Sequence, residues 1–372
     1  MDKSTGSIRQ RGPNTWELRI YQGVNASSGK EQWATKTVHG GRRYASAQLA
    51  EFRTVASQGR LCAGTVTDLL EQWCRAASPG WAATTHRETR SLIDRHLVPH
   101  LGHRAIAKLT TADIDDFYRH LLKHGGREER ALAPGTVQRV HVVLHRALAQ
   151  AVRWDWIWVN PASQASPPRA APPEICPPNP DAVSKLLAHV AATDRAFYVF
   201  LMLAATTGAR RGELLALRWK DIDLDTNTVA FQRSLIEGVN GPVLAPTKTR
   251  RSHRVTLDAT TADAVREYGN QQTRSDHEGF VFSSDDEGKK PWLPNRATKT
   301  FIRFRVAAGL SHFRLHDLRH FMATQMLDAG VPVMVVAARL AHARASTTLN
   351  VYAHAIPGSD QSAAEVLRAR MV

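Results

Sequence analysis

A proline-rich stretch near the middle of the chain constrains its architecture more than any other feature. Eight prolines fall in the twenty residues PASQASPPRAAPPEICPPNP, Pro161–Pro180. Proline fixes φ and has no backbone donor, so this stretch predicts an extended linker rather than a helix or a central strand. It leaves about 160 residues before it and about 190 after it, which is room for two or three domains.

The first sixty residues carry the pattern of a small sheet with one helix. Apolar and polar residues alternate in TWELRIYQG, which is typical of a half-buried strand. A second strand is predicted over Trp33–Val38. A short helix follows, indicated by apolar residues at helical spacing: Ala45, Leu49 and Phe52.

Residues 61–162 predict a helical module. Thr110 and Asp113 have the spacing of a capping box before an apolar helical stripe. Thr136 is placed to cap a long helix. Apolar residues at i, i+3, i+4 and i+7 predict a further helix near the start of the module: Val66, Leu69, Leu70 and Trp73.

The remainder is predicted to be mainly helical with a small antiparallel sheet. Helices are expected over Asp181–Val190 and Asp194–Thr207, and strands over Thr228–Gln232 and His253–Leu257. The predicted fold class is therefore multidomain α+β. Its expected parts are a sheet-and-helix module (1–60), a helical domain (61–162), a linker (163–179) and a mainly α domain (180–372).

The charge balance narrows the choice of partners. Forty-nine Lys and Arg against thirty-four Asp and Glu give a net charge of +15, which favours a polyanion such as nucleic acid over an anionic membrane. The three cysteines form no CxxC pair, which argues against a zinc ribbon or a disulfide framework. Neither a signal peptide nor a membrane-spanning run is visible. We therefore expect a cytoplasmic protein that binds nucleic acid.

Four short stretches in the last 170 residues carry groups suited to one phosphate. They are TTGARRGELLAL (206–217), PTKTRRSHRVTL (246–257), FRLHDLRH (313–320) and LAHARASTTLNVY (340–352). In a helix, His316 and Arg319 lie on one face, and an arginine fork matches phosphate oxygens. His320 is expected to point elsewhere and to be structural.

The order and spacing of these groups are more specific than any one of them. TGxRxxE comes first, then a lysine in a turn between two strands, then HxxRH, then LxH, and a tyrosine ten residues after that histidine. This series resembles the tyrosine recombinase family, the phage integrases in particular, over most of Asp181–Val372. The earlier residues resemble, more loosely, an arm-type DNA-binding module and a SAM-like core-binding domain.

The resemblance implies a role for each matching residue. Tyr352 would be the nucleophile, Glu213 would support the first arginine, and Ala341, where the family usually has glycine, would fit a helix. No metal or cofactor is implied. The remaining catalytic residues would be Arg210, Lys248, His316, Arg319 and His342.

These roles suit strand cleavage without a metal ion. A tyrosine ester to the 3′ phosphate stores the bond energy, with His316 as the base. Arg210 and Arg319 would stabilise the charge of the transition state, helped by His342, and Lys248 would protonate the leaving oxygen. Basic residues expected to contact DNA elsewhere are Arg9, Arg11, Arg19, Arg42, Arg43, Arg139, Arg250 and Arg251.

The implied partners are double-stranded attachment sites of core and arm types, bound by a homotetramer. The resemblance adds a host DNA-bending protein and an excision factor, in a bacterial host beside the nucleoid. Three alternatives stay open. A non-enzymatic DNA-binding regulator would also be basic and modular, His316–Asp317 could belong to a metal-dependent phosphohydrolase, and a type IB topoisomerase uses similar chemistry.

Overall fold

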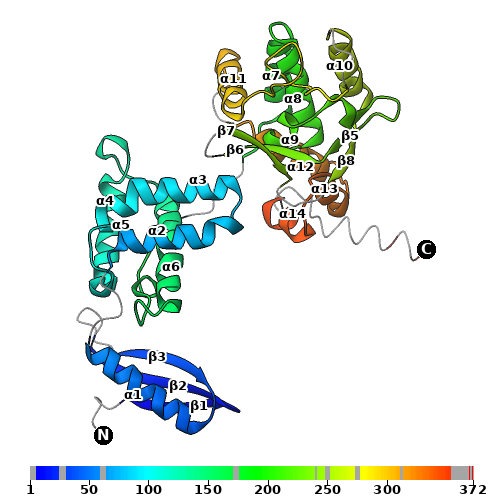
Figure 1. Cartoon of the computed structure of the whole chain (residues 1–372). Helices are drawn as coiled ribbons and strands as arrows, with labels where there is room; N and C mark the ends of the chain where they lie inside the picture. The colour runs from blue at the N-terminus through cyan, green and yellow to red at the C-terminus, as the bar shows by residue number, and fades with distance from the viewer. Residues whose placement is uncertain are drawn as a thin grey trace. The chain divides into compact units, whose positions relative to one another are not determined.

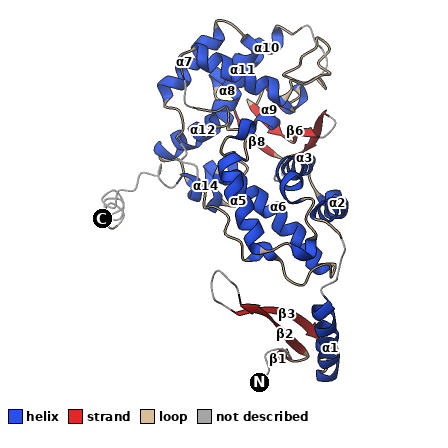
Figure 2. Cartoon of the chain, turned by 90° about the vertical axis from the view of Figure 1, so that its left-hand side faces the viewer, coloured by secondary structure: helices blue, strands red, loops and turns tan. Residues whose placement is uncertain are grey.

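The chain folds into two compact units, Met1–Pro172 and Pro173–Val372 (Figure 1). Helices predominate, and strands gather in the N-terminal module and in the second unit (Figure 2). Within the described residues, no helix is both long enough and apolar enough to cross a bilayer. The computed structural model describes residues 6–24, 31–58, 64–170, 176–238, 241–247, 252–272, 277–310 and 313–352, with Arg368 and Met371.

The N-terminal module is a three-stranded antiparallel sheet with a helix packed on it. The strands lie in the order β1 (Ser7–Gly12), β2 (Thr15–Val24) and β3 (Glu31–His39), and α1 (Arg42–Gln58) follows. The two predicted strands and the helix are confirmed, whereas β1 was not foreseen. The core of the module joins one sheet face to α1 through Leu18, Ile20, Val38, Ala45 and Phe52.

A helical module completes the first unit. Thr110 starts α5 with the predicted capping box, in which its hydroxyl accepts from Asp113 N at 3.2 Å and Asp113 Oδ2 accepts from Thr110 N at 3.0 Å. A π-helical turn at Ile93–Leu97 joins α3 to α4. The helices are α2 (Val66–Ala77), α3 (Ala83–Leu92), α4 (Val98–Leu101), α5 (Thr111–His124) and α6 (Pro134–Arg153).

The start of α6 corrects a prediction. The helix begins at Pro134 with Ala133 as N-cap and has no side-chain cap, so Thr136 does not begin it. Proline suits the first helical position because its φ is already helical and that position needs no N–H. Thr136 instead lies in the first turn, where its hydroxyl accepts from Arg139 Nη2 at 3.2 Å.

The proline-rich stretch is not extended at its start. Pro161–Ser163 form a 3-10 turn, capped by the Asn160 side chain, which accepts from Ala162 N at 2.9 Å. Ala162 is buried in the helical module, and Ser166 N donates to Asp115 Oδ1 at 2.7 Å. Local capping and apolar burial therefore tie the first residues of the stretch to the first unit. Regular structure resumes at Pro180.

The second unit is built around α8, which is buried along most of its length and packs against α7, α10 and α12. Asn179 caps α7 and Asp194 caps α8 through side-chain oxygens. Both helices were predicted to within about two residues of their ends. The helices are α7 (Pro180–Ala191), α8 (Arg195–Thr207), α9 (Arg211–Leu215), α10 (Ala259–Asn270), α11 (Pro294–Ala307), α12 (Asp317–Asp328), α13 (Val333–Arg339) and α14 (Ala345–Tyr352).

The described residues of this unit form two small sheets. One has the antiparallel order β4 (Ile222–Asp223), β5 (Thr228–Phe231) and β8 (His253–Thr256) and contains both predicted strands. The other is a hairpin of β6 (Arg233–Gly238) and β7 (Gly241–Pro246), which the sequence pattern did not predict. β7 contains Pro242 and Pro246, and proline in an apolar run argues against a strand unless it lies at an edge.

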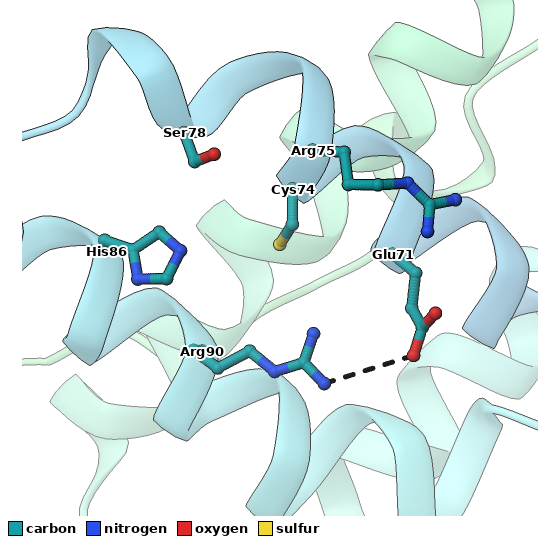
Figure 3. Close-up of a pocket in the computed structure, with 6 residues that line it drawn as sticks. All are labelled: Glu71, Cys74, Arg75, Ser78, His86 and Arg90. Carbon is teal, nitrogen blue, oxygen red and sulfur yellow. Dashed lines mark ion pairs between the residues drawn. The ribbon is translucent and has the colours of Figure 1, made fainter. Parts of the chain in front are cut away.

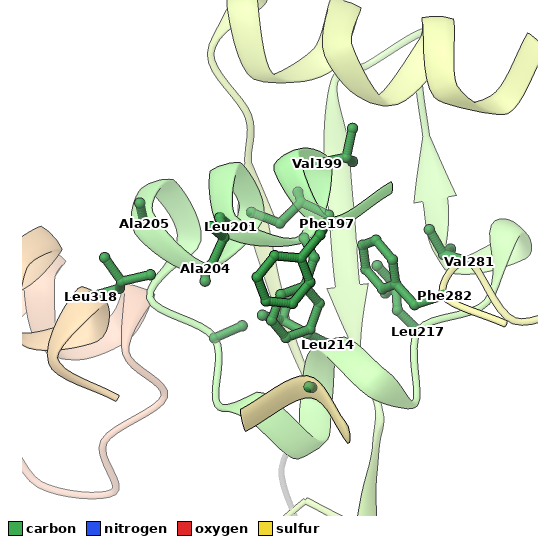
Figure 4. Packing of buried hydrophobic residues seen from close by; sticks show 14 of the residues in the cluster. Phe197, Val199, Leu201, Ala204, Ala205, Leu214, Leu217, Val281, Phe282 and Leu318 are labelled. Carbon is green, nitrogen blue, oxygen red and sulfur yellow. The ribbon is translucent and has the colours of Figure 1, made fainter. Parts of the chain in front are cut away.

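The core beside α8 sets the position of α12. Phe200 packs edge-on against Phe282 with ring centroids 5.2 Å apart. Leu318 of α12 is buried and points toward Ala205 and its neighbours on α8 (Figure 4). Because Arg319 is the next residue along the helix, this packing fixes where its side chain enters the interior.

Candidate active site

Arg319 is a buried arginine that joins three separate segments. Its Nη1 donates to the carbonyl of Gly208 at 2.5 Å, and its Nη2 donates to the carbonyl of Leu340 at 2.6 Å and contacts His342 Nε2 at 3.1 Å. Burial, and then the nearby Arg210, lower the pKa of Arg319 to about 10. The guanidinium is still charged at pH 7.

The glycine of the TG motif that precedes Arg210 is Gly208, and its conformation accounts for the motif. It ends α8 in the left-handed region with φ +65°, and an added Cβ would lie 2.2 Å from Met322 Cε and 3.1 Å from Leu340 Cδ2. Glycine alone fits such a conformation and such a close approach. The turn exposes the carbonyl that holds Arg319.

Arg210 is held by a buried carboxylate. It precedes α9, where its backbone N donates to Glu213 Oε2 at 2.8 Å and its Nη1 donates to Glu213 Oε1 at 2.9 Å. Glu213 is 1% exposed and Arg210 is half-buried. The three-residue spacing in TGxRxxE therefore produces a short-range brace that orients the guanidinium.

His342 is fixed through both ring nitrogens. Arginine only donates, so Nε2 must accept from Arg319, and Nδ1–H then donates to the buried Thr348 Oγ1 at 2.7 Å. Burial, followed by Arg319 and Arg210, lowers the pKa of His342 to about 4. The ring is therefore neutral in the free protein.

The residue before His342 corrects a sequence-based expectation. Ala341 is not helical. It lies in the left-handed region with φ +50°, where its N–H donates to Ala338 O at 2.9 Å and the N–H of His342 donates to Ala337 O at 2.9 Å. This pair of bonds is the Schellman cap of α13, a position that favours glycine because it has no Cβ.

Replacing Ala341 with glycine should therefore stabilise the protein. We expect a gain of about 1 kcal/mol, since a left-handed Cβ costs on the order of 1–2 kcal/mol and the added chain freedom returns part of it. Chemical denaturation with a linear extrapolation measures the change. The matched control Ala338→Gly, at an exposed helical position, should instead lose up to about 1 kcal/mol. A destabilised Ala341→Gly would contradict the strained-cap interpretation.

Tyr352 contacts a histidine that the sequence analysis set aside. The tyrosine ends α14, is 1% exposed, and its hydroxyl lies 2.7 Å from His320 Nδ1. Burial raises the pKa of Tyr352 to about 12, with Arg319 acting in the opposite direction. The interpretation of His320 as a residue pointing away from the site is wrong.

His316 lies at the start of α12 and is exposed, with its ring centroid 5.1 Å from that of His320. Protein atoms around the ring displace water and lower its pKa first, and His320 and Arg319 lower it further, although part of the residue stays open to solvent. The sequence held a signal for this pair, because residues four apart share a helix face. His316 and His320 thus form one histidine pair, and only His320 reaches Tyr352.

His253 is a second residue that the motifs did not single out. It lies on β8 with both ring nitrogens buried and without a hydrogen-bond partner, and its ring stacks on Phe231 at 5.1 Å. Burial lowers its pKa, and Glu213, Arg319 and Arg210 also act on it. It therefore lies beside the arginine pair.

Not every predicted site residue can be placed. Lys248, Arg250 and Arg251 lie outside the described residues, as do positions 353–367 after the tyrosine. In the first unit, Arg9, Arg42 and Arg43 are exposed. Arg11 pairs with Glu17 at 2.8 Å, and Arg19 lies over the Trp33 ring at 5.1 Å.

A pocket in the helical module holds none of the predicted site residues. Its lining includes Cys74 and Ser78, and Arg90 Nη2 lies 4.0 Å from Glu71 Oε1 (Figure 3). Burial raises the pKa of the Cys74 thiol, which opposes a nucleophilic role. Across the described ranges of the whole chain, no cluster of three or more His, Cys, Asp or Glu residues could hold a metal ion.

Two family models match this chain. The model described as "Phage integrase family" matches residues 179–357, and that described as "Phage integrase, N-terminal SAM-like domain" matches residues 65–122. The first range contains every catalytic residue that the sequence motifs indicated, and the second lies within the helical module.

Known proteins also resemble the chain as a whole. A putative prophage phiRv2 integrase of Mycobacterium tuberculosis is 25% identical over 376 residues, which cover 97% of this chain and 94% of that protein. The Tn1549 transposon integrase, solved with circular-intermediate DNA, matches with a TM-score of 0.69 and 19% identity over 82% of this chain and 99% of that chain. A lambda integrase tetramer bound to a Holliday junction matches with a TM-score of 0.58 and 17% identity over 92% and 96%. The solved structures share the fold of this chain.

Proposed function

Since the chain belongs to the phage integrase family of tyrosine recombinases, we propose that Tyr352 attacks a DNA phosphate and stores the bond energy as a 3′-phosphotyrosine ester. The protein is a site-specific recombinase of a mobile element. The stored ester allows strands to be rejoined without ATP, because the freed 5′ hydroxyl attacks it in reverse.

One observation carries this proposal. Arg210 and Arg319 come from segments more than a hundred residues apart, yet Arg319 donates to the carbonyl of Gly208, two residues before Arg210, and Arg210 lowers the pKa of Arg319. Glu213 forms an ion pair with Arg210, and Arg319 forms no ion pair among the described residues, so one carboxylate faces two positive charges. A phosphate between the two forks would relieve that repulsion and gain charge-assisted hydrogen bonds.

The tyrosine needs a base rather than prior ionisation. At pH 7 a hydroxyl with a pKa of about 12 is ionised in about one molecule in 10⁵, a free-energy cost of about 7 kcal/mol. Proton removal during attack avoids most of that cost. His316 and His320 are the imidazoles at this end of α12 that could accept the proton.

The departing 5′ oxygen needs a proton in turn, and Lys248 is our proposed donor. Arg210 and Arg319 would stabilise the negative charge that develops on the non-bridging oxygens. His342 uses both ring nitrogens in the free protein, so it would contact the phosphate only after exchanging its bond to Arg319. The negative charge of an arriving phosphate favours the imidazolium form, which has an N–H to donate.

Recombination of two duplexes requires four strand cuts, so we propose a homotetramer on DNA. The lambda integrase tetramer on a Holliday junction supports this by its shared fold. The proposed substrates are core-type sites for the helical module and the second unit, and arm-type sites for residues 1–60. A host DNA-bending protein and an excision factor are proposed accessory partners, and the reaction would occur in the host cytoplasm beside the nucleoid.

Cleavage should proceed without any metal ion. We expect a nicked suicide duplex, carrying a core site from the ends of the element, to give a covalent protein–DNA band in excess EDTA with no nucleotide added. The arginine pair supplies the charge that a metal would otherwise provide. Denaturing gels measure the band. Cleavage that needs magnesium and leaves no covalent product would instead favour the phosphohydrolase alternative.

Removing residues 1–60 should separate cleavage from complete recombination. Arg9 and Arg19 lie on the sheet face opposite α1, since Ser7 pairs with Arg19 and Arg9 with Glu17. We expect the truncated protein to cleave a core site at a near-normal rate and to lose integration between arm-bearing sites. Full-length Arg9→Ala/Arg19→Ala is the matched variant, expected to weaken arm binding alone. Equal integration by the truncated and intact proteins would refute the arm-binding role.

A further inference from the structure

The proposed nucleophile contacts one of the two histidines that could accept its proton, and that histidine, His320, was not among the residues that the sequence motifs indicated as catalytic. The Tyr352 hydroxyl lies 2.7 Å from His320 Nδ1, and the two ring centroids are 5.5 Å apart. His320 comes from α12 and Tyr352 from α14, so the contact joins two elements thirty-two residues apart. It is not a consequence of local helix geometry.

The direction of this hydrogen bond follows from burial. Tyr352 is 1% exposed, and a buried hydroxyl proton needs an acceptor. A neutral imidazole accepts through one nitrogen, and Nδ1 is the atom that faces the hydroxyl. The Tyr352 hydroxyl therefore donates to Nδ1, and Nε2 carries the ring hydrogen.

We propose that His320, rather than His316, accepts the proton of Tyr352 as the tyrosine attacks the phosphate. The O–H bond breaks as the O–P bond forms, and Nδ1 gains the proton, so His320 becomes an imidazolium. The bond from phosphorus to the 5′ oxygen breaks, and that oxygen takes a proton from the donor proposed above. In rejoining, His320 returns its proton to the tyrosine oxygen. The inference rests on the proposed function of Tyr352.

The groups around His320 favour its neutral form. Burial has the largest effect and lowers the pKa of His320. On its own segment, Asp317 raises this pKa, whereas Arg319 and Arg314 lower it. The His316 ring lies 5.1 Å away, Tyr352 approaches from α14, and His342 is within electrostatic reach. The pKa of His320 is therefore lowered from its ordinary value. A base must be unprotonated to act, so cleavage should slow as the pH falls through the pKa of His320 and should not depend on this group well above that pKa.

The substitution His320→Asn distinguishes a general base from a residue that only positions Tyr352. The amide oxygen of His320→Asn can occupy the place of Nδ1 and accept the same hydrogen bond, but it cannot hold the proton. We expect single-turnover cleavage of the suicide duplex to fall by at least about 100-fold in His320→Asn, the scale of general-base catalysis. The slowing that wild type shows at low pH should also be lost. A rate within about 3-fold of wild type, with the low-pH slowing retained, would leave His320 only a positioning role and overturn the proposal.

Two controls assign the defect to the tyrosine proton. His277→Asn, at an exposed turn of the same unit, should cleave like wild type. A duplex with sulfur in place of the 5′ bridging oxygen has a leaving group that needs no proton, so it should not rescue His320→Asn. Rescue by sulfur would place His320 at the leaving group and overturn the inference.

A readout without turnover keeps the inference testable if His320→Asn folds poorly. In ¹⁵N-histidine-labelled wild-type protein, His320 should be the Nε2–H tautomer, and Tyr352→Phe should change its pKa. An Nδ1–H tautomer would overturn the proposal. The nucleophile role of Tyr352 and the base role of His320 can also be refuted separately. A covalent band from Tyr352→Phe refutes the nucleophile, whereas loss of the band in Tyr352→Phe but not in His320→Asn refutes only the base.

Discussion

Tyr352→Phe should abolish the covalent protein–DNA complex and leave DNA binding nearly unchanged. The substitution removes one oxygen, the atom that forms the ester. Affinity should persist because phosphate contacts are made by the basic residues of the chain. Denaturing gels of a nicked suicide duplex measure the first property, and gel shifts at a stated salt concentration measure the second.

The phenylalanine also removes a buried hydrogen bond, so folding needs its own measurement. His320 Nδ1 loses its partner, which should cost about 1–2 kcal/mol of stability. Tyr198→Phe, a half-buried tyrosine on α8, is the matched control and should cleave like wild type. A covalent band that persists in Tyr352→Phe would show that another residue is the nucleophile.

Arg319→Lys should slow cleavage by at least about 100-fold, the scale for loss of one preorganised donor at a developing charge. One ammonium cannot reproduce the planar fork that reaches Gly208 O, Leu340 O and His342 together. The measurement is the single-turnover rate at saturating protein. Arg303→Lys, at an exposed position on α11, is the control for an arginine-to-lysine substitution as such and should change the cleavage rate little.

Arg319→Ala should add a folding defect to the catalytic one. It leaves two buried carbonyls without their donor, at a cost of about 1–3 kcal/mol each. Arg210→Ala should slow cleavage as strongly with a different stability effect, because it leaves the buried Glu213 carboxylate without its ion pair. A near wild-type rate for Arg319→Lys would exclude a role for the guanidinium fork at the phosphate.

Contacts within one turn could be predicted from the sequence. Thr110 and Asp113 cap α5 as expected, and Glu213 braces Arg210 three residues away. The groups proposed to be catalytic were also recognisable, because their order and spacing resemble those of the tyrosine recombinase family. Errors arose where backbone conformation and not residue type decided the outcome, as at the start of α6 and at the left-handed Ala341.

The pairing within the site was decided by tertiary structure alone. His316 and His320 lie four residues apart on α12, and nothing in FRLHDLRH says which one meets a tyrosine more than thirty residues later. The choice depends on where α14 docks, and a buried cluster that includes Met322, Leu340 and Tyr352 fixes that position. Sequence spacing therefore determined which side chains are neighbours within one helical turn, as Arg210 and Glu213 are. Which groups touch across elements depended on how the apolar faces of α12, α13 and α14 pack, and that is a property of the folded chain.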